Sequence, residues 1–408
     1  MEYGVIGEHL IHSFSKEIHG QLGDYPYELR EIPQGALEAF MTERDFRAIN
    51  VTIPYKQDVI PFLHEVEPAA AAIGAVNTVV NRDGLLYGYN TDFGGMVGLI
   101  ERTGIDLKNK KVLILGTGGT SKTAEAVARH LGAASVQKVS RTEKPGALTY
   151  EQVLSSHLDA QVLINTTPRG MFAQEGGMAL DPGLFSDLRG VIDAVYNPLR
   201  TEFVQKARSM GVPAAGGLYM LVRQAVLASE IFLGVRYPEE VTERVYRRIK
   251  SGKENIVLTG MPGSGKTTVG RLLAEKMGRP FLDTDALVEA KTGMAPGKLI
   301  QSQGEAAFRE AETEVIREIS ARTGCVIATG GGVVLRKENV DLLKRNGKIC
   351  FLDRPVELLV PTGDRPLSAT PEAIRKRYAE RYPIYAATAD TVIANCDTPE
   401  AAVRKVLV

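Results

Sequence analysis

The stretch Gly260-Met261-Pro262-Gly263-Ser264-Gly265-Lys266-Thr267 decides the fold of the chain around it. An apolar run, residues 256–259, precedes it, and residues 268–274 follow with a helix-forming pattern, so the order is strand, glycine-rich loop and helix. In such a P-loop the backbone N–H groups and the helix start cradle phosphates. Lys266 can reach the β- and γ-phosphates and the Thr267 hydroxyl can bind Mg²⁺. The alternative is a glycine-rich turn that binds nothing.

The overall composition indicates a soluble protein of several domains. The chain has 408 residues, 44% of them hydrophobic and 24% charged, which predicts two or three domains with ordinary cores. Lys plus Arg and Asp plus Glu both total 49, so the formal net charge is +0. This balance argues against a nucleic acid as the general partner.

The cysteine spacing, the first residues and the length of the apolar runs together point to the cytoplasm. The cysteines are Cys325, Cys350 and Cys396, and their spacing shows neither a disulfide framework nor a zinc site. The first residues lack the basic and apolar regions of a signal peptide. The longest apolar runs are too short to cross a bilayer. We therefore expect a cytoplasmic protein without a membrane partner.

The first part of the chain carries polar residues next to predicted strands. Ser13 and Ser15 follow the strand expected at residues 3–7, and two hydroxyls on one side of an extended segment suit a polyhydroxylated or carboxylated ligand. The alternative is a serine turn or a helix cap. A proline stops the alternating run at residues 49–53, and Lys56 lies just beyond it, where lysines are usually solvated.

A second pair of strands is predicted around an Asp83-Gly84 hairpin turn. The first of them is expected at residues 72–80 and carries Asn77 in the middle of the run. The return strand leads to Asp92 at a strand-to-helix junction, where the simplest role for an aspartate is the helix N-cap.

Together these pieces resemble shikimate dehydrogenase. The matching elements are Ser13-x-Ser15, Asn50-Val51-Thr52-Ile53-Pro54-Tyr55-Lys56, Gly74-Ala75-Val76-Asn77-Thr78 and Gly88-x-Asn90-Thr91-Asp92. The resemblance implies that Lys56 and Asp92 are the catalytic pair. Residues implied to hold the substrate are Ser13, Ser15, Thr52, Asn77, Asp92, Tyr196 and Gln224. An ammonium hydrogen-bonded to a carboxylate can donate a proton to a ketone oxygen as hydride arrives at carbon. The family commonly has Ser-Pro after the second serine and Asn after the histidine, where this chain has Lys16 and Gly20.

The second part of the chain has a dinucleotide-binding pattern. Residues 110–115 form a predicted buried strand that enters a helix through Gly116, Gly118, Gly119 and Thr120, a variant of the G-x-G-x-x-G fingerprint. After the next strand an NAD site would have an acidic residue, but the chain has Ser140-Arg141-Thr142. A guanidinium and two hydroxyls fit a 2′-phosphate, so we predict NADP.

Further strands with polar ends at residues 162–171 and 191–199 continue a βαβ alternation, which predicts a doubly wound, Rossmann-type sheet. A long apolar helix is expected from residue 216 and carries Gln224; the alternative to a substrate contact is that Gln224 faces solvent. A charged helix at 237–250 and a short flexible joint at 251–254 follow.

The third part of the chain adds polar residues that follow the P-loop. Asp283 and Asp285 lie at a predicted strand end, where one can support Mg²⁺ and the other can accept a proton. The alternative is a helix cap preceded by a turn aspartate. Arg309 is predicted on a helix, Gly330-Gly331-Gly332 at the end of a strand and Arg381 near a helix end.

This third part resembles shikimate kinase. The matching elements are the P-loop, Asp283-x-Asp285, Phe308-Arg309-x-x-Glu312, Gly330-Gly331-Gly332, Asp364-Arg365-Pro366-Leu367 and Arg381-x-x-x-Tyr385. The resemblance implies that Asp285, Arg309, Arg381 and the backbone of Gly331 and Gly332 hold shikimate, and that Arg365 is a lid arginine over the phosphates. The ATP-binding residues are then Gly263, Ser264, Gly265, Lys266, Thr267 and Thr268, with Thr267 and Asp283 at Mg²⁺. The lid stretch before Arg365 is short for this family.

The sequence thus predicts an α/β protein with three domains. These are a substrate-binding domain (1–93, with 216–250 packing back), an NADP-binding Rossmann domain (94–215) and a P-loop kinase domain with a helix-flanked parallel sheet (253–408). The predicted function is reduction of 3-dehydroshikimate with NADPH and then phosphorylation of shikimate with ATP, with a homo-oligomer possible. Alternatives are a quinate/shikimate dehydrogenase with a weakly active kinase domain, and a non-catalytic metabolite-sensing regulator.

Overall fold

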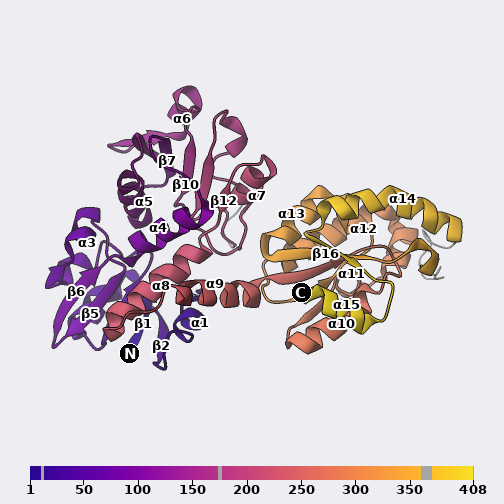
Figure 1. The fold of residues 1–408 in the computed structure, drawn as a ribbon, viewed down its shortest axis with the longest axis horizontal. Helices are drawn as coiled ribbons and strands as arrows, with labels where there is room; N and C mark the ends of the chain where they lie inside the picture. Colours follow the sequence, from indigo (N-terminus) through magenta and orange to yellow (C-terminus); the bar gives the residue numbers. More distant parts are fainter. Residues whose placement is uncertain (11–12, 173–176, 360–369, 408) are drawn as a thin grey trace. The chain divides into compact units, whose positions relative to one another are not determined.

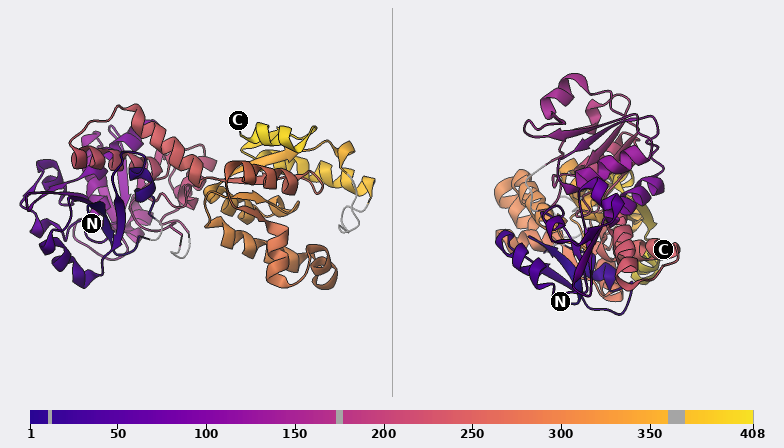
Figure 2. Two further views of the ribbon diagram at one scale, coloured as in Figure 1. Left: turned by 90° about the horizontal axis from the view of Figure 1, so that it is seen from below. Right: turned by 90° about the vertical axis from the view of Figure 1, so that its left-hand side faces the viewer.

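The computed structural model describes residues 1–10, 13–172, 177–359 and 370–407. The chain divides into two compact units, Met1–Lys250 and Ser251–Val408, which are called unit 1 and unit 2 below. Figures 1 and 2 show helices and strands in both units, so the predicted α/β class is confirmed. Within the described residues, no helix is both long and apolar enough to cross a membrane.

Unit 1 contains two sheets with helices against them. Its strands are β1 (Tyr3–Gly7), β2 (Tyr27–Glu31), β3 (Ala48–Val51), β4 (Glu65–Val66), β5 (Thr78–Arg82), β6 (Leu85–Tyr89), β7 (Lys111–Leu115), β8 (Ser135–Ser140), β9 (Ala147–Thr149), β10 (Val162–Asn165), β11 (Gly190–Asp193) and β12 (Ala214–Ala215). Its helices are α1 (Ser15–His19), α2 (Leu37–Glu43), α3 (Pro68–Ile73), α4 (Thr91–Thr103), α5 (Gly119–His130), α6 (Tyr150–Ser156), α7 (Glu202–Ser209), α8 (Leu218–Leu233) and α9 (Glu240–Lys253).

The first sheet has the order β2-β1-β3-β5-β6-β4 and mixes parallel and antiparallel pairs. Alternate residues of β3 face opposite sides, because side chains in a strand point to opposite faces in turn. Ile49 packs with α2, whereas Ala48 belongs to a cluster that includes Phe232 of α8. Helix α8, far along the chain, therefore covers one face of this sheet.

The second sheet has the order β12-β11-β10-β7-β8-β9, and its strands pair in parallel. Strand β7 alternates between its two faces: Val112 and Ile114 pack with α4 and α5, and Leu113 and Leu115 pack with α6 and α7. Helices on both faces explain why β7 is apolar throughout its buried part. This is the predicted doubly wound arrangement.

Unit 2 is a parallel sheet of the order β14-β15-β13-β16-β17. Its strands are β13 (Asn255–Thr259), β14 (Phe281–Asp283), β15 (Val326–Ala328), β16 (Gly347–Asp353) and β17 (Thr391–Ala394). Its helices are α10 (Lys266–Met277), α11 (Thr284–Thr292), α12 (Pro296–Ser320), α13 (Lys337–Asn346), α14 (Pro371–Thr388) and α15 (Pro399–Val406). In β13, Val257 packs with α12 and α13, while Leu258 packs with α10 and α15.

Some local predictions were wrong. The strand expected from residue 72 begins only at Thr78, because Pro68 starts the short helix α3 and Gly74 ends it with φ +68°. The joint expected at residues 251–254 is helical as far as Lys253.

Aspartate positions also differ from the prediction. Asn90 caps α4 by accepting a hydrogen bond from the Phe93 N–H, so Asp92 is not the N-cap. Asp285 lies in the first turn of α11 and not at a strand end. Asp92 and Asp285 therefore both lie in the first turn of a helix, α4 and α11 respectively.

Candidate active sites

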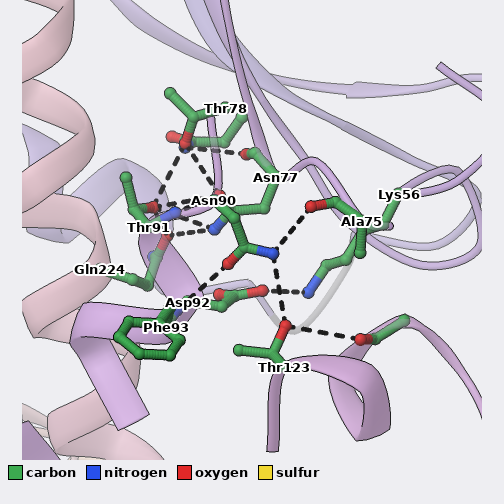
Figure 3. Close-up of polar contacts among 12 residues, drawn as sticks. Lys56, Ala75, Asn77, Thr78, Asn90, Thr91, Asp92, Phe93, Thr123 and Gln224 are labelled. Carbon is green, nitrogen blue, oxygen red and sulfur yellow. Dashed lines mark hydrogen bonds and ion pairs between the residues drawn. The ribbon is translucent and has the colours of Figure 1, made fainter. Parts of the chain in front are cut away.

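A buried ion pair lies at the junction of the two sheets of unit 1. Lys56 follows the turn after β3, Asp92 is the second residue of α4, and the Nζ–Oδ2 distance is 2.6 Å. Figure 3 shows the Lys56 amine next to the Asp92 carboxylate. Their side chains are only 12% and 8% exposed, so water screens their charges weakly. Lys56 is therefore not the solvated lysine that its position after a strand suggested.

Asn77 is the centre of a hydrogen-bond network beside this pair (Figure 3). Its Oδ1 accepts from the Thr91 N–H at 2.8 Å, and its Nδ2 donates to Thr91 Oγ1 at 3.0 Å and to Gln224 Oε1 at 3.3 Å. Gln224 comes from α8 and is 7% exposed, so it does not face solvent. Gln224 Nε2 also donates to the Leu221 carbonyl at 2.8 Å, so hydrogen bonds within the protein fix the orientation of both amides.

Asn50 forms hydrogen bonds that hold Asn77 and Thr78 in position. The Tyr27 hydroxyl donates to Asn50 Oδ1 at 2.6 Å, and Asn50 Nδ2 donates to Thr78 Oγ1 at 3.2 Å and to the Asn77 carbonyl at 3.3 Å. The His19 ring stacks on Tyr27 with centroids 3.8 Å apart, and burial lowers the His19 pKa to about 3. Sequence reasoning did not select Asn50, Thr91 or Tyr27 as site residues. The available signal was a polar Asn inside an otherwise apolar strand.

The two serines form a tight turn and not an extended segment. Ser15 N–H donates to Ser13 Oγ at 3.3 Å, and the two hydroxyl oxygens are 3.1 Å apart. Between them Phe14 packs edge-on against Tyr196, with centroids 5.3 Å apart. Burial raises the pKa of Tyr196 to about 12, so its hydroxyl stays protonated and can donate.

Thr52 follows directly after β3, beside Gly7 at the end of β1. A β-carbon added to Gly7 would come within 2.6 Å of Thr52 Cγ2, so the glycine allows this close approach. Among the hydrogen bonds of the described residues, none joins Ser13, Ser15 or Thr52 to the Asn77 network. Among the described residues, hydrogen bonds therefore join Asn77, Thr91 and Gln224, Asp92 follows Thr91 in α4, and Ser13 and Ser15 bond to each other.

The dinucleotide turn between β7 and α5 lies against Lys56. Gly116 has φ +117°, and a β-carbon there would be 2.7 Å from Thr166 Oγ1. A β-carbon on Gly119 would be 3.3 Å from Lys56 Cβ, whereas one on Gly118 would meet open space. The backbone is thus accessible at Gly118, and Gly119 lies next to Lys56. This arrangement suits a cofactor that must reach the substrate beside Lys56.

The residues after β8 carry no acidic group where NAD recognition would need one. Ser140 is buried and accepts a hydrogen bond from the Thr142 N–H at 3.4 Å, while Arg141 is exposed. Lys144 Nζ donates to Thr117 Oγ1 at 3.1 Å, and Thr120 lies in the first turn of α5. Positive charge beside the glycine turn fits a phosphorylated ribose.

In unit 2 the P-loop has the backbone of a phosphate cradle. Gly263 and Gly265 have φ +80° and +88°, values that a glycine adopts without strain. Lys266 Nζ donates to the carbonyls of Gly260 and Met261 at 3.0 and 2.9 Å, and Asn395 Nδ2 donates to the Ser264 carbonyl at 2.7 Å. Ser264 is buried, whereas Thr268 is exposed.

Asp283 is the helix cap that the sequence offered as an alternative, and it also contacts Thr267. Its Oδ1 accepts from the Asp285 N–H at 3.1 Å as the N-cap of α11, and its Oδ2 accepts from Thr267 Oγ1 at 2.8 Å. Among the described residues no group of three or more His, Cys, Asp or Glu side chains could hold a metal. A Mg²⁺ ion at Thr267 and Asp283 would therefore take further oxygen ligands from nucleotide and water, as is usual for this ion.

The three glycines after β15 bring charged side chains together. A β-carbon on Gly330 would be 2.6 Å from Asp285 Oδ1 and 2.8 Å from Glu312 Oε1. One on Gly332 would be 2.1 Å from Arg309 Nη2. Only residues without a β-carbon allow this approach.

Two arginines are held at this glycine strand end. Arg381 Nη1 donates to the Gly331 carbonyl at 2.9 Å, and the Tyr385 hydroxyl donates to the same oxygen. Arg309 is paired with Glu312 at 2.7 Å and with Glu305 at 3.1 Å. The site therefore presents two fixed guanidinium groups near Asp285.

Some supporting residues of this site were not predicted. Glu312 is fully buried, and burial raises its pKa although the charge of Arg309 opposes that shift. Arg336 Nη1 donates to the Arg309 carbonyl at 3.0 Å. Glu312 and Tyr385 were visible in the quoted motifs, but nothing in their spacing showed which groups they hold. Arg365 lies outside the described residues.

Comparison with known proteins assigns unit 1. Residues 5–79 match the family model of the shikimate dehydrogenase substrate binding domain. A shikimate dehydrogenase (NADP(+)) of Clostridium perfringens is 33% identical over 271 residues, which are 61% of this chain and 98% of the relative. The chain belongs to the shikimate dehydrogenase family.

Solved structures agree with this assignment. A shikimate 5-dehydrogenase from Thermus thermophilus, in complex with NADP(H) and shikimate, is 30% identical with a TM-score of 0.55, and the match covers 61% of this chain and 99% of that one. A quinate dehydrogenase from Corynebacterium glutamicum, in complex with NAD, is 26% identical with a TM-score of 0.53, covering 62% and 99%.

Unit 2 belongs to a different family. Residues 262–408 match the family model of shikimate kinase. The predicted fusion of a shikimate dehydrogenase and a shikimate kinase is therefore confirmed. The chain is an enzyme of two parts, an NADP-dependent oxidoreductase and an ATP- and Mg²⁺-dependent kinase.

Proposed function

We propose that the chain catalyses two consecutive reactions of the shikimate pathway. Unit 1 reduces 3-dehydroshikimate to shikimate with NADPH, and unit 2 transfers a phosphoryl group from ATP to that shikimate. The observation that carries the proposal is the buried Lys56–Asp92 pair, 2.6 Å apart, placed between the Asn77 network and the glycine turn at Gly119.

In unit 1, Lys56 donates the proton that the carbonyl oxygen of the substrate needs during reduction. Asp92 keeps the ammonium charged and oriented, and the low exposure of the pair strengthens its effect on the developing alkoxide. Asn77 and Gln224 bind ring hydroxyls with the amide groups that their mutual hydrogen bond fixes in place. Ser13, Ser15 and Thr52 bind the substrate carboxylate, with Tyr196 beside Phe14 of the same turn.

Recognition of the cofactors follows from the two glycine-rich loops. Arg141, with Ser140, Thr142 and the nearby Lys144, binds the 2′-phosphate of NADP, and Gly116–Gly119 approach its pyrophosphate. When bound, NADPH supplies the hydride and Mg²⁺-ATP supplies the phosphoryl group. The P-loop, Lys266 and Thr267 bind the triphosphate, and Arg365 completes the charge around it.

In unit 2, Arg309 and Arg381 bind the shikimate carboxylate, and Asp285 orients the attacking hydroxyl. The proposal is supported by the Gly330–Gly332 strand end, against which all three side chains lie. Glu312 and Glu305 hold the Arg309 guanidinium in place before substrate arrives, which lowers the entropic cost of binding.

We further propose three domains, 1–93 with 216–250, 94–215 and 253–408. We also propose that the enzyme acts in the cytoplasm. Its three cysteines, all among the described residues, are unpaired, which fits a reducing compartment. Association into a homo-oligomer is a further expectation that sedimentation of the purified chain would test.

A coupled assay tests the proposal. With 3-dehydroshikimate, NADPH and ATP, the full chain should oxidise NADPH and then release phosphorylated shikimate. Lys56→Ala should stop NADPH oxidation yet still phosphorylate added shikimate, and Lys266→Ala should accumulate shikimate. NADPH oxidation that survives Lys56→Ala, or absence of phosphorylated product from the unsubstituted chain, would contradict it.

A second candidate keeps the same chemistry in unit 1 but gives it quinate-type substrates. It is favoured by the similarity to a quinate dehydrogenase noted above and by Lys16 and Gly20, which depart from the usual shikimate dehydrogenase pattern. Quinate has an additional hydroxyl where shikimate has a ring double bond, a difference that a hydrogen-bonding site can distinguish. The ratio of kcat/KM for shikimate and quinate in the oxidation direction decides between them.

A further inference from the structure

A cavity of about 500 Å³ lies in unit 1 apart from the residues assigned above. It is enclosed by the ends of α4 and α7, strand β12, the start of α8 and helix α9. Its volume is within the range of pockets that hold small organic molecules. The residues that matter here are Arg102, Arg200, Arg208, Tyr219, Tyr246 and Lys250.

The lining is strongly positive. Among the described residues that line the cavity are Arg102, Arg200, Arg208 and Lys250, and no carboxylate. Arg200 and Arg208 both line the cavity, and burial, together with the charge of Arg200, lowers the pKa of Arg208. An anion bound in the cavity would be attracted by both guanidinium groups.

Some of these cations are already held in position. Arg208 donates to the Ala214 carbonyl from Nε and Nη2 at 3.0 and 2.9 Å. Arg102 lies over the rings of Tyr219 and Tyr246, at 5.0 and 4.6 Å from their centroids, and is paired with Glu243 at 3.1 Å. A ligand would therefore meet fixed donors and two aromatic rings, with less entropy to lose on binding.

Helix α8 adds to the positive potential. Leu218 and Tyr219, in its first turn, line the cavity, and the N-terminus of a helix favours negative charge. The same helix carries Gln224 of the proposed active site. A β-carbon on Gly98 of α4 would meet Tyr219 and one on Gly95 would meet Gln224, so both side chains of α8 lie along α4.

We propose that this cavity is a second ligand site of unit 1, for a small organic phosphate that also carries a carboxylate. Arginine side chains bind both groups through paired N–H donors, and the cavity offers enough cations for more than one negative group. The size of the cavity favours a compact ligand over a dinucleotide, and the tyrosine rings provide contacts for its carbon skeleton.

Shikimate 3-phosphate is a compound of this class and serves as the first probe, a choice that rests on the proposed function. Inorganic pyrophosphate is the second probe and does not depend on it. Calorimetric titrations use the full chain carrying Lys266→Ala and Arg381→Ala, with NADP⁺ saturating, so that the nucleotide and acceptor sites contribute little heat.

Adding Arg200→Gln or Lys250→Gln to this background should weaken binding of the first probe at least about tenfold, because each removes one cation from the cavity. Arg244→Gln changes an exposed arginine of α9 outside the cavity and should leave the affinity unchanged. If Arg200→Gln fails to fold, as judged by circular dichroism, Lys250→Gln still gives the answer.

Binding of either probe that depends on Arg200 or Lys250 supports an anion site, and preference for shikimate 3-phosphate over pyrophosphate supports the phosphate-plus-carboxylate class. No binding of either probe, or equal affinity in all variants, overturns the proposal. Reduction of 3-dehydroshikimate by the same Arg200→Gln and Lys250→Gln chains without the background changes is measured separately. If the unsubstituted chain does not reduce 3-dehydroshikimate, the proposed function is contradicted, whereas the result of the binding experiment still stands.

Discussion

The two substrate sites of this chain are built from different kinds of groups. In unit 1, neutral amides lie beside the Lys56–Asp92 ion pair: the Asn77 side chain donates to Gln224, and Asn50 donates to the Asn77 backbone carbonyl. In unit 2, Arg309 and Arg381 are held by carboxylates and by a backbone carbonyl. Both sites are proposed to bind the same ring carboxylate, so the difference lies in how the protein prepares for it.

The difference follows from what each reaction changes. Reduction moves a hydride and a proton, and the buried Lys56–Asp92 pair supplies the needed charge in weakly screened surroundings. Phosphoryl transfer brings a highly negative nucleotide next to a substrate carboxylate, so cations must be present before either arrives. We infer that the neutral network of unit 1 mainly orients its ligand, whereas the arginines of unit 2 mainly supply positive charge.

The largest effect is expected for Lys56→Ala. Loss of the proton donor should reduce the rate of 3-dehydroshikimate reduction by about 10²–10⁴-fold. Phosphorylation of shikimate should be unchanged. Lys122→Ala is the matched control, because Lys122 is a nearby lysine that bonds to Gln57 and not to Asp92. A similar loss in both variants would mean that general charge, and not this ion pair, matters.

The next largest effect is expected for Arg381→Ala in unit 2. Arg381 is a buried cation of the proposed shikimate site. Removing it should cost about 2–5 kcal/mol of the binding free energy for shikimate, so kcat/KM should fall, mainly through a higher KM. Arg375→Ala alters an exposed arginine of the same helix and should have little effect. Initial rates at varied shikimate concentration measure both. An unchanged KM would remove Arg381 from the charged site.

A buried carboxyl in unit 1 tests, through the free energy of unfolding, how well neutral donors stabilise a buried charge. Asp193 accepts hydrogen bonds from Asn165, Thr201 and the Val195 N–H, all neutral donors, and burial raises its pKa from 3.8 to about 6. The folded state therefore holds this proton more tightly than the unfolded state. The contribution is present below about pH 4 and is lost as the pH rises to about 6, amounting to about 3 kcal/mol.

Asp193→Asn should therefore flatten the pH dependence of unfolding between about pH 4 and 6, as measured by urea denaturation. Asp187→Asn, at an exposed carboxyl of the same unit, should keep the wild-type slope in that range. Equal slopes for the unsubstituted chain and Asp193→Asn would show that the neutral donors compensate fully for burial of the charge.

The smallest effect is expected for Tyr27→Phe. It removes the single 2.6 Å hydrogen bond to Asn50 while keeping the ring that stacks on His19. Leaving Asn50 Oδ1 without this donor should cost about 1–2 kcal/mol of stability and a few-fold in kcat/KM of reduction. Phosphorylation should not change. If only stability falls, Asn50 supports the fold without orienting Asn77.

The sequence predicted those parts whose signals are local. Glycine spacing revealed both nucleotide loops, and continuous apolar runs revealed β7 and β13, since each pattern depends on neighbours in the chain. The segment at residues 72–77 was misassigned because its mainly apolar run looked like a strand, whereas Pro68 and the alanines after it favour a helix that ends at Gly74.

Contacts between distant residues could not be read from the sequence in the same way. Gln224 reaches Asn77 across 147 residues, and only the packing of α8 against the first sheet brings them together. Glu312 was visible three residues after Arg309, a helical spacing that allows an ion pair, but its burial depends on the glycines that follow β15. Motifs identified the chemical groups, and the fold determined their partners.

The contact between Asn395 and the P-loop gives a practical route to observing nucleotide binding. Cys396, the next residue, is exposed, whereas Cys325 and Cys350 are buried and burial raises the pKa of Cys350 to about 11. A thiol-reactive fluorophore at neutral pH should therefore attach at Cys396 in the natural sequence. Because the Asn395 amide bonds to the Ser264 carbonyl, the dye would lie one residue from the phosphate loop. Its emission should report ATP binding by unit 2 in the presence of NADPH turnover by unit 1.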